Sequence, residues 1–275
     1  MKHKYLSVIF LISGLFCFSQ VNGSRLDSLL SLSKTQKNRT LVKTLNEISW
    51  EFKNSQIDSS LFYAKRSLAI AEEIKDEQSI ASAYNSMASS FEASNDLDSA
   101  EMYHQKSLKI KLKINDIIGT ADTYTNLGII EDLKSNNDLA LKYYFKALEI
   151  YEKHSDDFEK VPTVLVNIGI VYKKQKEYQK TLDYYGKALK IYEQNNFKIG
   201  IAITTGNIGS VLLNTEDYKK AIAYSEKAKQ LYDTLGYSRY KPYMQINIAV
   251  AKDSLKQFEA ARKDFLSAIL DFKKD

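Results

Sequence analysis

Asparagines are the polar residues with the most regular spacing in this 275-residue chain. They recur every 40 or 41 residues, each followed by an apolar residue and then by glycine or alanine, at Asn126, Asn167, Asn207 and Asn247. A carboxamide both donates and accepts hydrogen bonds, so it matches the N–H and C=O groups of an extended peptide backbone. The spacing therefore predicts a row of carboxamides that binds a peptide with loose sequence preference.

The residues that commonly carry out catalysis or bind metals form no convincing group. His104 replaces an aromatic residue at a packing position, so we expect it in the core or at its edge. His154 precedes Asp156 and Asp157, but solvation of a turn is more common for such a group than metal binding. The sequence has no Gly-rich phosphate loop, no HExxH, no GxSxG and a single cysteine, Cys17. We therefore predict no enzyme activity, no metal and no cofactor.

The regular asparagines belong to a repeated pair of amphipathic helices, clearest at residues 165–193. Leu165 and Gly169 share one face of the first helix, and Leu182 and Ala188 share one face of the second. A single pair cannot bury both apolar stripes, so it requires neighbours of the same kind. The second helices repeat small residues in step, at Ala140 and Ala147, Thr181 and Ala188, Ala221 and Ala228, and Ala261 and Ala268.

This pattern resembles the tetratricopeptide repeat (TPR) family. The matching residues are the apolar–Gly or apolar–Ala pair, an aromatic residue three positions later (Phe91, Tyr172) and the paired small residues of the second helix. The aromatic position is lost at Glu131, Leu212 and Lys252. The resemblance implies an all-α fold, a right-handed α-α superhelix (TPR solenoid) of about six helix pairs. The expected array covers 40–275, with repeats at approximately 40–76, 77–116, 117–157, 158–197, 198–237 and 238–275.

The N-terminus has the pattern of a secretory signal peptide. Lys2 and Lys4 precede an apolar run over 5–18, which is shorter than the ~20 apolar residues of a membrane span. We expect a signal peptide at 1–19 and an exported protein, periplasmic or secreted, without stable membrane insertion after cleavage. The alternatives are an uncleaved anchor or a buried first helix. A capping helix and linker are expected at 24–39.

Repeat proteins bind partners on the concave surface that one helix of each pair lines. First-helix residues that point away from the packing face are therefore the candidates for peptide binding. They are Asn85, Asn126, Asn167, Lys174, Asn207, Asn214 and Asn247. The alternative is that these asparagines only satisfy neighbouring helices or turns.

The charge pattern favours a solvated helical surface. The formal net charge is +5, and charges of both signs are interspersed. Even the most basic run, 106–113, does not place its lysines on one face, so we expect no nucleic-acid partner. The favoured function is an exported TPR scaffold that binds a peptide or protein segment in its groove. The alternative is the extracytoplasmic sensor portion of a bacterial histidine kinase or helix-turn-helix regulator without its output domain. The sequence leaves the oligomeric state open.

Overall fold

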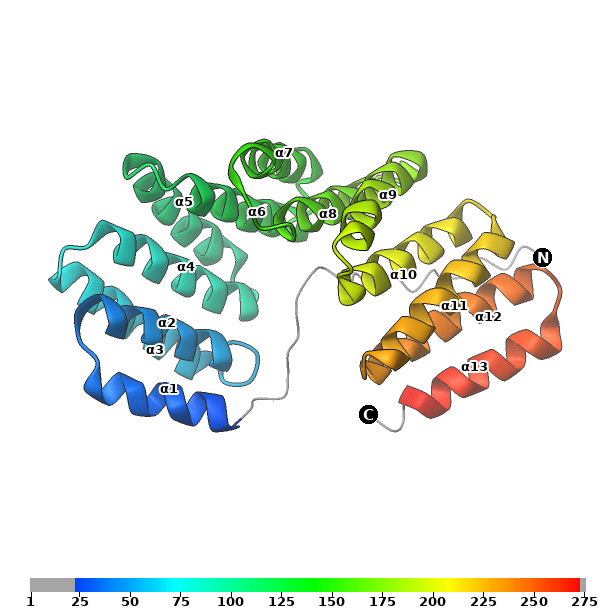
Figure 1. The fold of residues 1–275 in the computed structure, drawn as a ribbon, viewed down its shortest axis with the longest axis horizontal. Helices are drawn as coiled ribbons and strands as arrows, with labels where there is room; N and C mark the ends of the chain where they lie inside the picture. Colours follow the sequence, from blue (N-terminus) through cyan, green and yellow to red (C-terminus); the bar gives the residue numbers. More distant parts are fainter. Residues whose placement is uncertain (1–22, 273–275) are drawn as a thin grey trace. The chain divides into compact units, whose positions relative to one another are not determined.

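The computed structural model describes residues 23–272, and Figure 1 labels the α-helices of this range. The described range contains no β-strand. The helices are α1 (Gly23–Thr35), α2 (Asn38–Phe52), α3 (Ile57–Glu73), α4 (Glu77–Ala93), α5 (Leu97–Lys113), α6 (Ile117–Leu133), α7 (Asn137–His154), α8 (Lys160–Lys174), α9 (Tyr178–Gln194), α10 (Lys198–Asn214), α11 (Tyr218–Thr234), the 3-10 helix η1 (Ser238–Tyr240), α12 (Lys241–Ser254) and α13 (Phe258–Phe272).

The helices form two compact units, which meet in the sequence between Ser155 and Asp156. The N-terminal unit holds the pairs α2–α3, α4–α5 and α6–α7, and the C-terminal unit holds α8–α9, α10–α11 and α12–α13. Within each unit the second helix of a pair also packs against the first helix of the next pair. The six pairs predicted from the repeat are therefore present. Helix α1 packs against α2, with Leu29 buried beside Leu45 and Ile48.

Most connections between helices use one compact turn, which fixes the angle between successive helices. A residue with φ between 51° and 76° follows each of nine helices, at Lys75, Asn95, Asn115, Ser135, Lys176, Asn196, Glu216, Gly236 and Lys256. The next N–H donates back to the carbonyl five residues earlier, as from Asp76 to Ala71 at 3.2 Å. The Asp76 side chain then caps α4 by accepting from the Ser79 N–H at 3.1 Å. One turn thus ends a helix and starts the next.

Small residues allow the two helices of each pair to approach closely. Each second helix buries two of them to 2% exposure or less, at Ser60 and Ser67, Ala100 and Ser107, Ala140 and Ala147, Thr181 and Ala188, Ala221 and Ala228, and Ala261 and Ala268. On the first helices, Gly169 faces the buried ring of Tyr185, and a Cβ on Gly169 would lie 2.6 Å from the Tyr185 Cδ1 atom. The glycine is therefore required by the large side chain opposite it.

Aromatic stacking joins the two helices of several pairs. Near-parallel rings lie 5.5–5.8 Å apart in the stacks Phe52–Tyr63, Phe91–Tyr103 and Tyr172–Tyr184. In the last pair, Lys252 and Asp264 occupy the repeat positions of the two stacked rings. Their side chains form an ion pair of 2.7 Å instead. In the third pair, Glu131 is buried and accepts a hydrogen bond from Asn136 Nδ2 at 2.8 Å. The polar side chains that replace the aromatic residue at Glu131 and Lys252 are thus each paired with a nearby polar group.

The predicted signal peptide at 1–19 lies outside the described residues, and its cleavage stays a prediction. Among the helices of residues 23–272, none combines the length and apolar character that crossing a bilayer requires.

Candidate binding groove

Helices α2 and α4 of the N-terminal unit line two adjoining pockets of about 210 and 410 Å³. Asn46 and Trp50 line both pockets, so the two are adjacent, and we call them together the Trp50 groove. Its lining residues are Arg25, Arg39, Val42, Lys43, Asn46, Glu47, Ser49, Trp50, Lys53, Ser60, Gln78, Ser79, Ser82, Asn85, Ser86, Ser89 and Ser90. Apart from Arg25 on α1, Ser60 on α3 and Lys53 at the end of α2, these residues come from the first helices α2 and α4.

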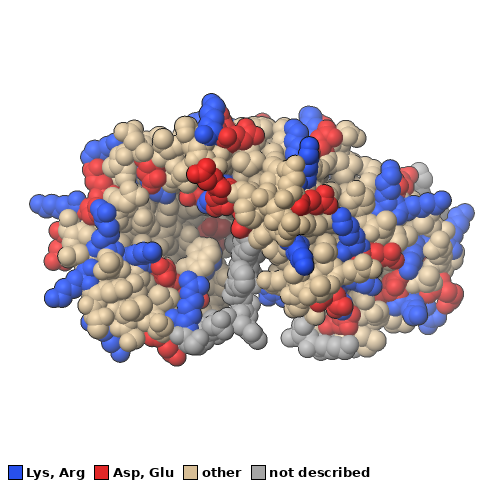
Figure 2. Space-filling model, viewed as in Figure 1, with Lys and Arg blue, Asp and Glu red and all other residues tan. Residues whose placement is uncertain are grey.

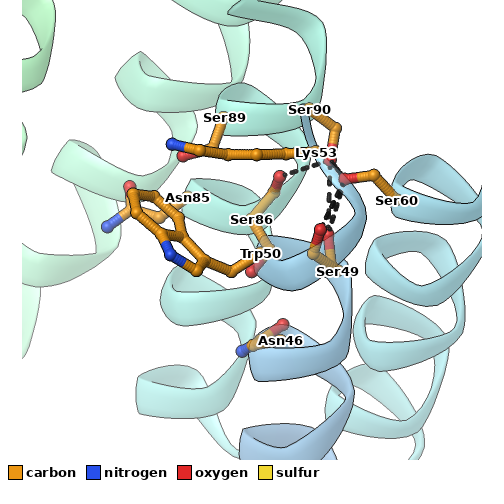
Figure 3. A pocket seen from close by; sticks show the side chains of 9 residues that line it. All are labelled: Asn46, Ser49, Trp50, Lys53, Ser60, Asn85, Ser86, Ser89 and Ser90. Atoms are coloured by element: carbon orange, nitrogen blue, oxygen red, sulfur yellow. Dashed lines mark hydrogen bonds between the residues drawn. The ribbon is translucent and has the colours of Figure 1, made fainter. Parts of the chain in front are cut away.

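Trp50 is the only tryptophan of the chain, and 52% of its surface is exposed. The Lys53 ammonium lies 3.2 Å from the centroid of the indole ring, which is a cation–π contact. Lys53 itself is buried, and Figure 3 shows its side chain extended above the Trp50 indole, with Asn85 and Ser89 of α4 beside it. One side of the groove therefore offers an exposed aromatic surface next to a partly desolvated positive charge.

Three buried serines form the floor of the smaller pocket (Figure 3). The hydroxyls of Ser49, Ser60 and Ser90 lie within 2.6–3.3 Å of one another. Ser60 also donates to the Ser49 carbonyl at 2.8 Å, and Ser90 to the Ser86 carbonyl at 3.0 Å. These hydroxyls are satisfied by each other, so the floor is small, polar and rigid.

Two carboxamides are held in fixed orientations at the edge of this pocket. Asn46 Oδ1 accepts from the Ser67 hydroxyl at 2.6 Å, and Asn85 Oδ1 lies 3.3 Å from His104 Nδ1. Burial lowers the pKa of His104 to about 3, with a smaller contribution from the charge of Lys111, so the imidazole is neutral at pH 7. A neutral imidazole that faces a carbonyl oxygen carries its proton on Nδ1. The second helices thus hold each amide oxygen, and each amide NH₂ is left to donate.

The groove carries charges of both signs, in keeping with the interspersed charges on the surface in Figure 2. Arg25 pairs with Glu51 at 3.2 Å, and Arg39 pairs with Asp76. Burial raises the pKa of Glu92, and the nearby charge of Lys53 partly offsets this effect. Within the described residues no group of three or more His, Cys, Asp or Glu side chains is placed to hold a metal ion.

The residues predicted to bind a peptide lie on five different first helices, and Asn85 is the one among them that lines the Trp50 groove. Asn126 on α6 and Asn247 on α12 are half-buried, and Asn167 on α8 is only 6% exposed. Asn214 is exposed and donates to the carbonyl of Ser210 in its own helix at 3.0 Å. Peptide binding by these asparagines stays a prediction.

Asn207 and Lys174 complete the predicted set. Both are half-buried, on α10 and α8 respectively. The Nδ2 atom of Asn207 is fully buried and has no hydrogen-bond acceptor among the described residues. Among the asparagines predicted to bind a peptide, Asn207 therefore has a buried NH₂ group without a hydrogen-bond acceptor in the described residues.

Sequence reasoning missed Asn46, Trp50 and Lys53. Asn46 precedes Asn85 by 39 residues, the spacing of the first two repeats, so the repeat register contained the signal for it. The single tryptophan was also visible in the sequence. The approach of Lys53 to the Trp50 ring depends on side-chain packing, which the repeat pattern does not contain.

Comparison with known proteins identifies the class. Residues 160–234 match the tetratricopeptide repeat family, and a comparison with curated protein sequences finds no match. The fold is similar to that of BtubC (BKLC) from P. vanneervenii, with a TM-score of 0.71 and 18% identity over 80% of this chain and 92% of that one. The predicted fold class, an all-α TPR fold of about six helix pairs, is confirmed, and the family match lies within the C-terminal unit, at residues 160–234.

Two further structures are similar. A Signal Transduction ATPase with Numerous Domains protein with a tetratricopeptide repeat sensor, from Pyrococcus horikoshii, has a TM-score of 0.66 and 25% identity. That match covers 81% of this chain and 36% of the other. A Rap protein complexed with competence and sporulation factor has a TM-score of 0.63 and 16% identity over 85% of this chain and 64% of that one. These similarities show that the described residues have the fold of a helical repeat scaffold.

Proposed function

We propose that this protein is an exported TPR scaffold that binds an extended peptide or protein segment along its first helices, with the Trp50 groove as a main contact region. The observation that carries the proposal is the pair of oriented carboxamides, Asn46 and Asn85, beside an exposed indole. The Rap protein complexed with competence and sporulation factor supports it, because that protein has a similar fold.

The groove chemistry suits a peptide backbone. The NH₂ groups of Asn46 and Asn85 would donate to two carbonyls of the segment, since the amide oxygens are already engaged. The partly exposed hydroxyls of Ser86 and Ser89 line the same pocket and would accept from its N–H groups. A side chain of the segment would then cover the Trp50 ring. Rigid aromatic anchors of this kind commonly dominate binding energy at protein interfaces.

Two matched arginine substitutions test the groove. Ser89→Arg would fill the smaller pocket, whereas Ala69→Arg adds the same side chain at an exposed position of the second helix α3. In affinity capture from the native host, we expect wild type and Ala69→Arg to recover the same partner. Ser89→Arg and Trp50→Ala should lose most of it while keeping the wild-type circular dichroism spectrum. Equal recovery with all four proteins would refute the groove as the binding region.

Export rests on the N-terminal pattern of lysines and a short apolar run. Mass spectrometry of the protein from fractionated cells tests it. We expect a mature chain that begins near Gln20 or Ser24 in the extracytoplasmic fraction. An intact N-terminus in the cytosolic fraction would contradict export.

A second candidate is a sensor role within a signalling protein. The similarity to the Pyrococcus horikoshii protein with a tetratricopeptide repeat sensor favours it. The gene sequence beyond Asp275 tests this candidate directly. A membrane helix and an output domain in frame would support the sensor role, and a stop codon directly after Asp275 would argue against it.

A further inference from the structure

The final helix that the structure describes, α13, carries three large apolar side chains on its outer face. Leu266, Ile269 and Leu270 are 51%, 51% and 59% exposed. Residues at such spacings share one side of a helix, so the three form an apolar stripe, which we call the Leu266 stripe. Apolar side chains that are clustered on a surface, rather than scattered singly, mark an interaction site.

The repeat itself does not require this stripe. The other second helices of the C-terminal unit, α9 and α11, each pack against the first helix of the pair that follows. Even so, their residues at the positions of Leu266 and Leu270 are exposed and not apolar. These residues are Gly186 and Lys190 on α9, and Glu226 and Gln230 on α11. A following pair leaves these positions uncovered, so the two leucines indicate a contact other than a further repeat.

Arg262, one helical turn before Leu266, supports the same conclusion. Its repeat position holds Leu182 on α9 and Ile222 on α11, and both of these are half-buried. Arg262 is exposed instead, and it has no ion pair or hydrogen bond within the part of the chain that the structure describes. A further pair packed like the others would remove this guanidinium from water without a partner, which is costly. The stripe therefore fits a partner that packs on the outer face of α13.

We propose that a second copy of this chain covers the Leu266 stripe, in an antiparallel contact between the two α13 helices with a two-fold axis at Leu266. The charges are self-complementary in this arrangement. Glu259 precedes Leu266 by seven residues, close to two helical turns, and Lys273 follows it by seven in the sequence, just outside the described residues. The axis sets the glutamate of each copy opposite the lysine of the other, whereas a parallel contact sets like charges together. Leu266 then meets its own counterpart.

The size of the stripe predicts a weak dimer. A stable protein interface buries about 800 Å² on each partner, over roughly 20–30 residues a side, and one face of this 15-residue helix offers fewer. We therefore expect association that depends on concentration. A bilayer is a poorer occupant, because the exposed charges beside the stripe are of both signs, with Glu259 close to Arg262 and Lys263. The proposal does not rest on the proposed function, which concerns α2 and α4 of the other unit.

Sedimentation equilibrium of the purified chain over a concentration series tests the dimer. We expect a monomer–dimer equilibrium for wild type. Leu266→Glu combined with Leu270→Gln gives α13 the residues that α11 has at these positions, and it should weaken association at least about tenfold with an unchanged circular dichroism spectrum. Leu112→Glu, at a leucine of α5 that is 52% exposed, is the matched control and should associate like wild type. A wild-type chain that stays monomeric up to about 0.5 mM would overturn the proposal. So would undiminished association of the double variant.

Crosslinking and charge exchange test the antiparallel register. In a Cys17→Ser background, Leu266→Cys places a thiol on the two-fold axis, so mild oxidation should join two chains by a disulfide, whereas Leu112→Cys should give only the product of random collisions. Glu259→Lys should weaken association, and adding Lys273→Glu should restore it. Equal crosslinking at positions 266 and 112, or no restoration, would contradict this contact. Either result leaves the Trp50 groove untested and intact, so the two proposals fail separately.

Discussion

Two glycines of the fourth helix pair allow the packing of this fold to be tested with one substitution at two positions. Gly169 on α8 faces the buried ring of Tyr185, whereas Gly186 on α9 is exposed, and no atom lies within 4 Å of the place that an alanine Cβ would take there. Alanine improves helix propensity by about 1 kcal/mol at either site. At Gly169, however, the new Cβ would lie 2.6 Å from Tyr185 Cδ1, and such overpacking typically costs about 1–3 kcal/mol.

Both substitutions gain the same helix propensity. The difference between their free energies of unfolding therefore reports the overpacking at Gly169 alone. We expect Gly186→Ala to raise the free energy of unfolding by up to about 1 kcal/mol. We expect Gly169→Ala to leave the protein about 1–3 kcal/mol less stable than Gly186→Ala. Urea unfolding followed by circular dichroism measures both, with equal m-values as the condition for comparison. In a Tyr185→Ala background the clash is absent, so Gly169→Ala should then behave like Gly186→Ala. Equal stability of the two single variants would refute the close approach.

Three further predictions concern charged and polar groups. His104 has a pKa of about 3 when folded and about 6.5 when unfolded, so the unfolded chain binds the proton first as the pH falls. Urea unfolding should therefore show about 2 kcal/mol less stability at pH 5 than at pH 7 from this residue, and His104→Phe should remove that contribution. Asp76→Ala should lower stability by about 1 kcal/mol in the same assay, since it removes the cap of α4. Lys173→Met should raise the thermal unfolding midpoint, because burial without a carboxylate partner disfavours the Lys173 ammonium; an unchanged or lower midpoint would argue that Lys173 is already compensated.

The sequence predicted the helix pairs well because their signals are local and repeated. The small residues of the second helices, such as Ala140 and Ala147, are fully buried, and His104 lies in the core. The sequence showed that Lys252 replaces an aromatic residue, but not that Asp264 replaces the ring that would stack on it. The ion pair between them appears only in the structure. Regular spacing in the sequence is therefore enough to predict the helix pairs and the residues buried between their helices.

The candidate site was less predictable, because a helical wheel describes one helix at a time. The wheel gives the direction in which Asn167 points, but it does not show how far neighbouring helices bury this side chain. In the structure Asn167 is only 6% exposed. Asn85 owes its orientation to His104 on the following helix, a contact that no spacing rule contains. The Trp50 groove similarly depends on how α2 and α4 pack together.

Site-specific photocrosslinking tests the central claim, that a protein segment binds on the first helices. The photoreactive amino acid p-benzoylphenylalanine would replace Trp50 in the groove, or Phe62 on the second helix α3, where the side chain is 59% exposed. Irradiation in the native host should give a discrete protein adduct from position 50 and none from position 62. The same adduct from both positions, or an adduct from position 62 alone, would contradict binding in the groove.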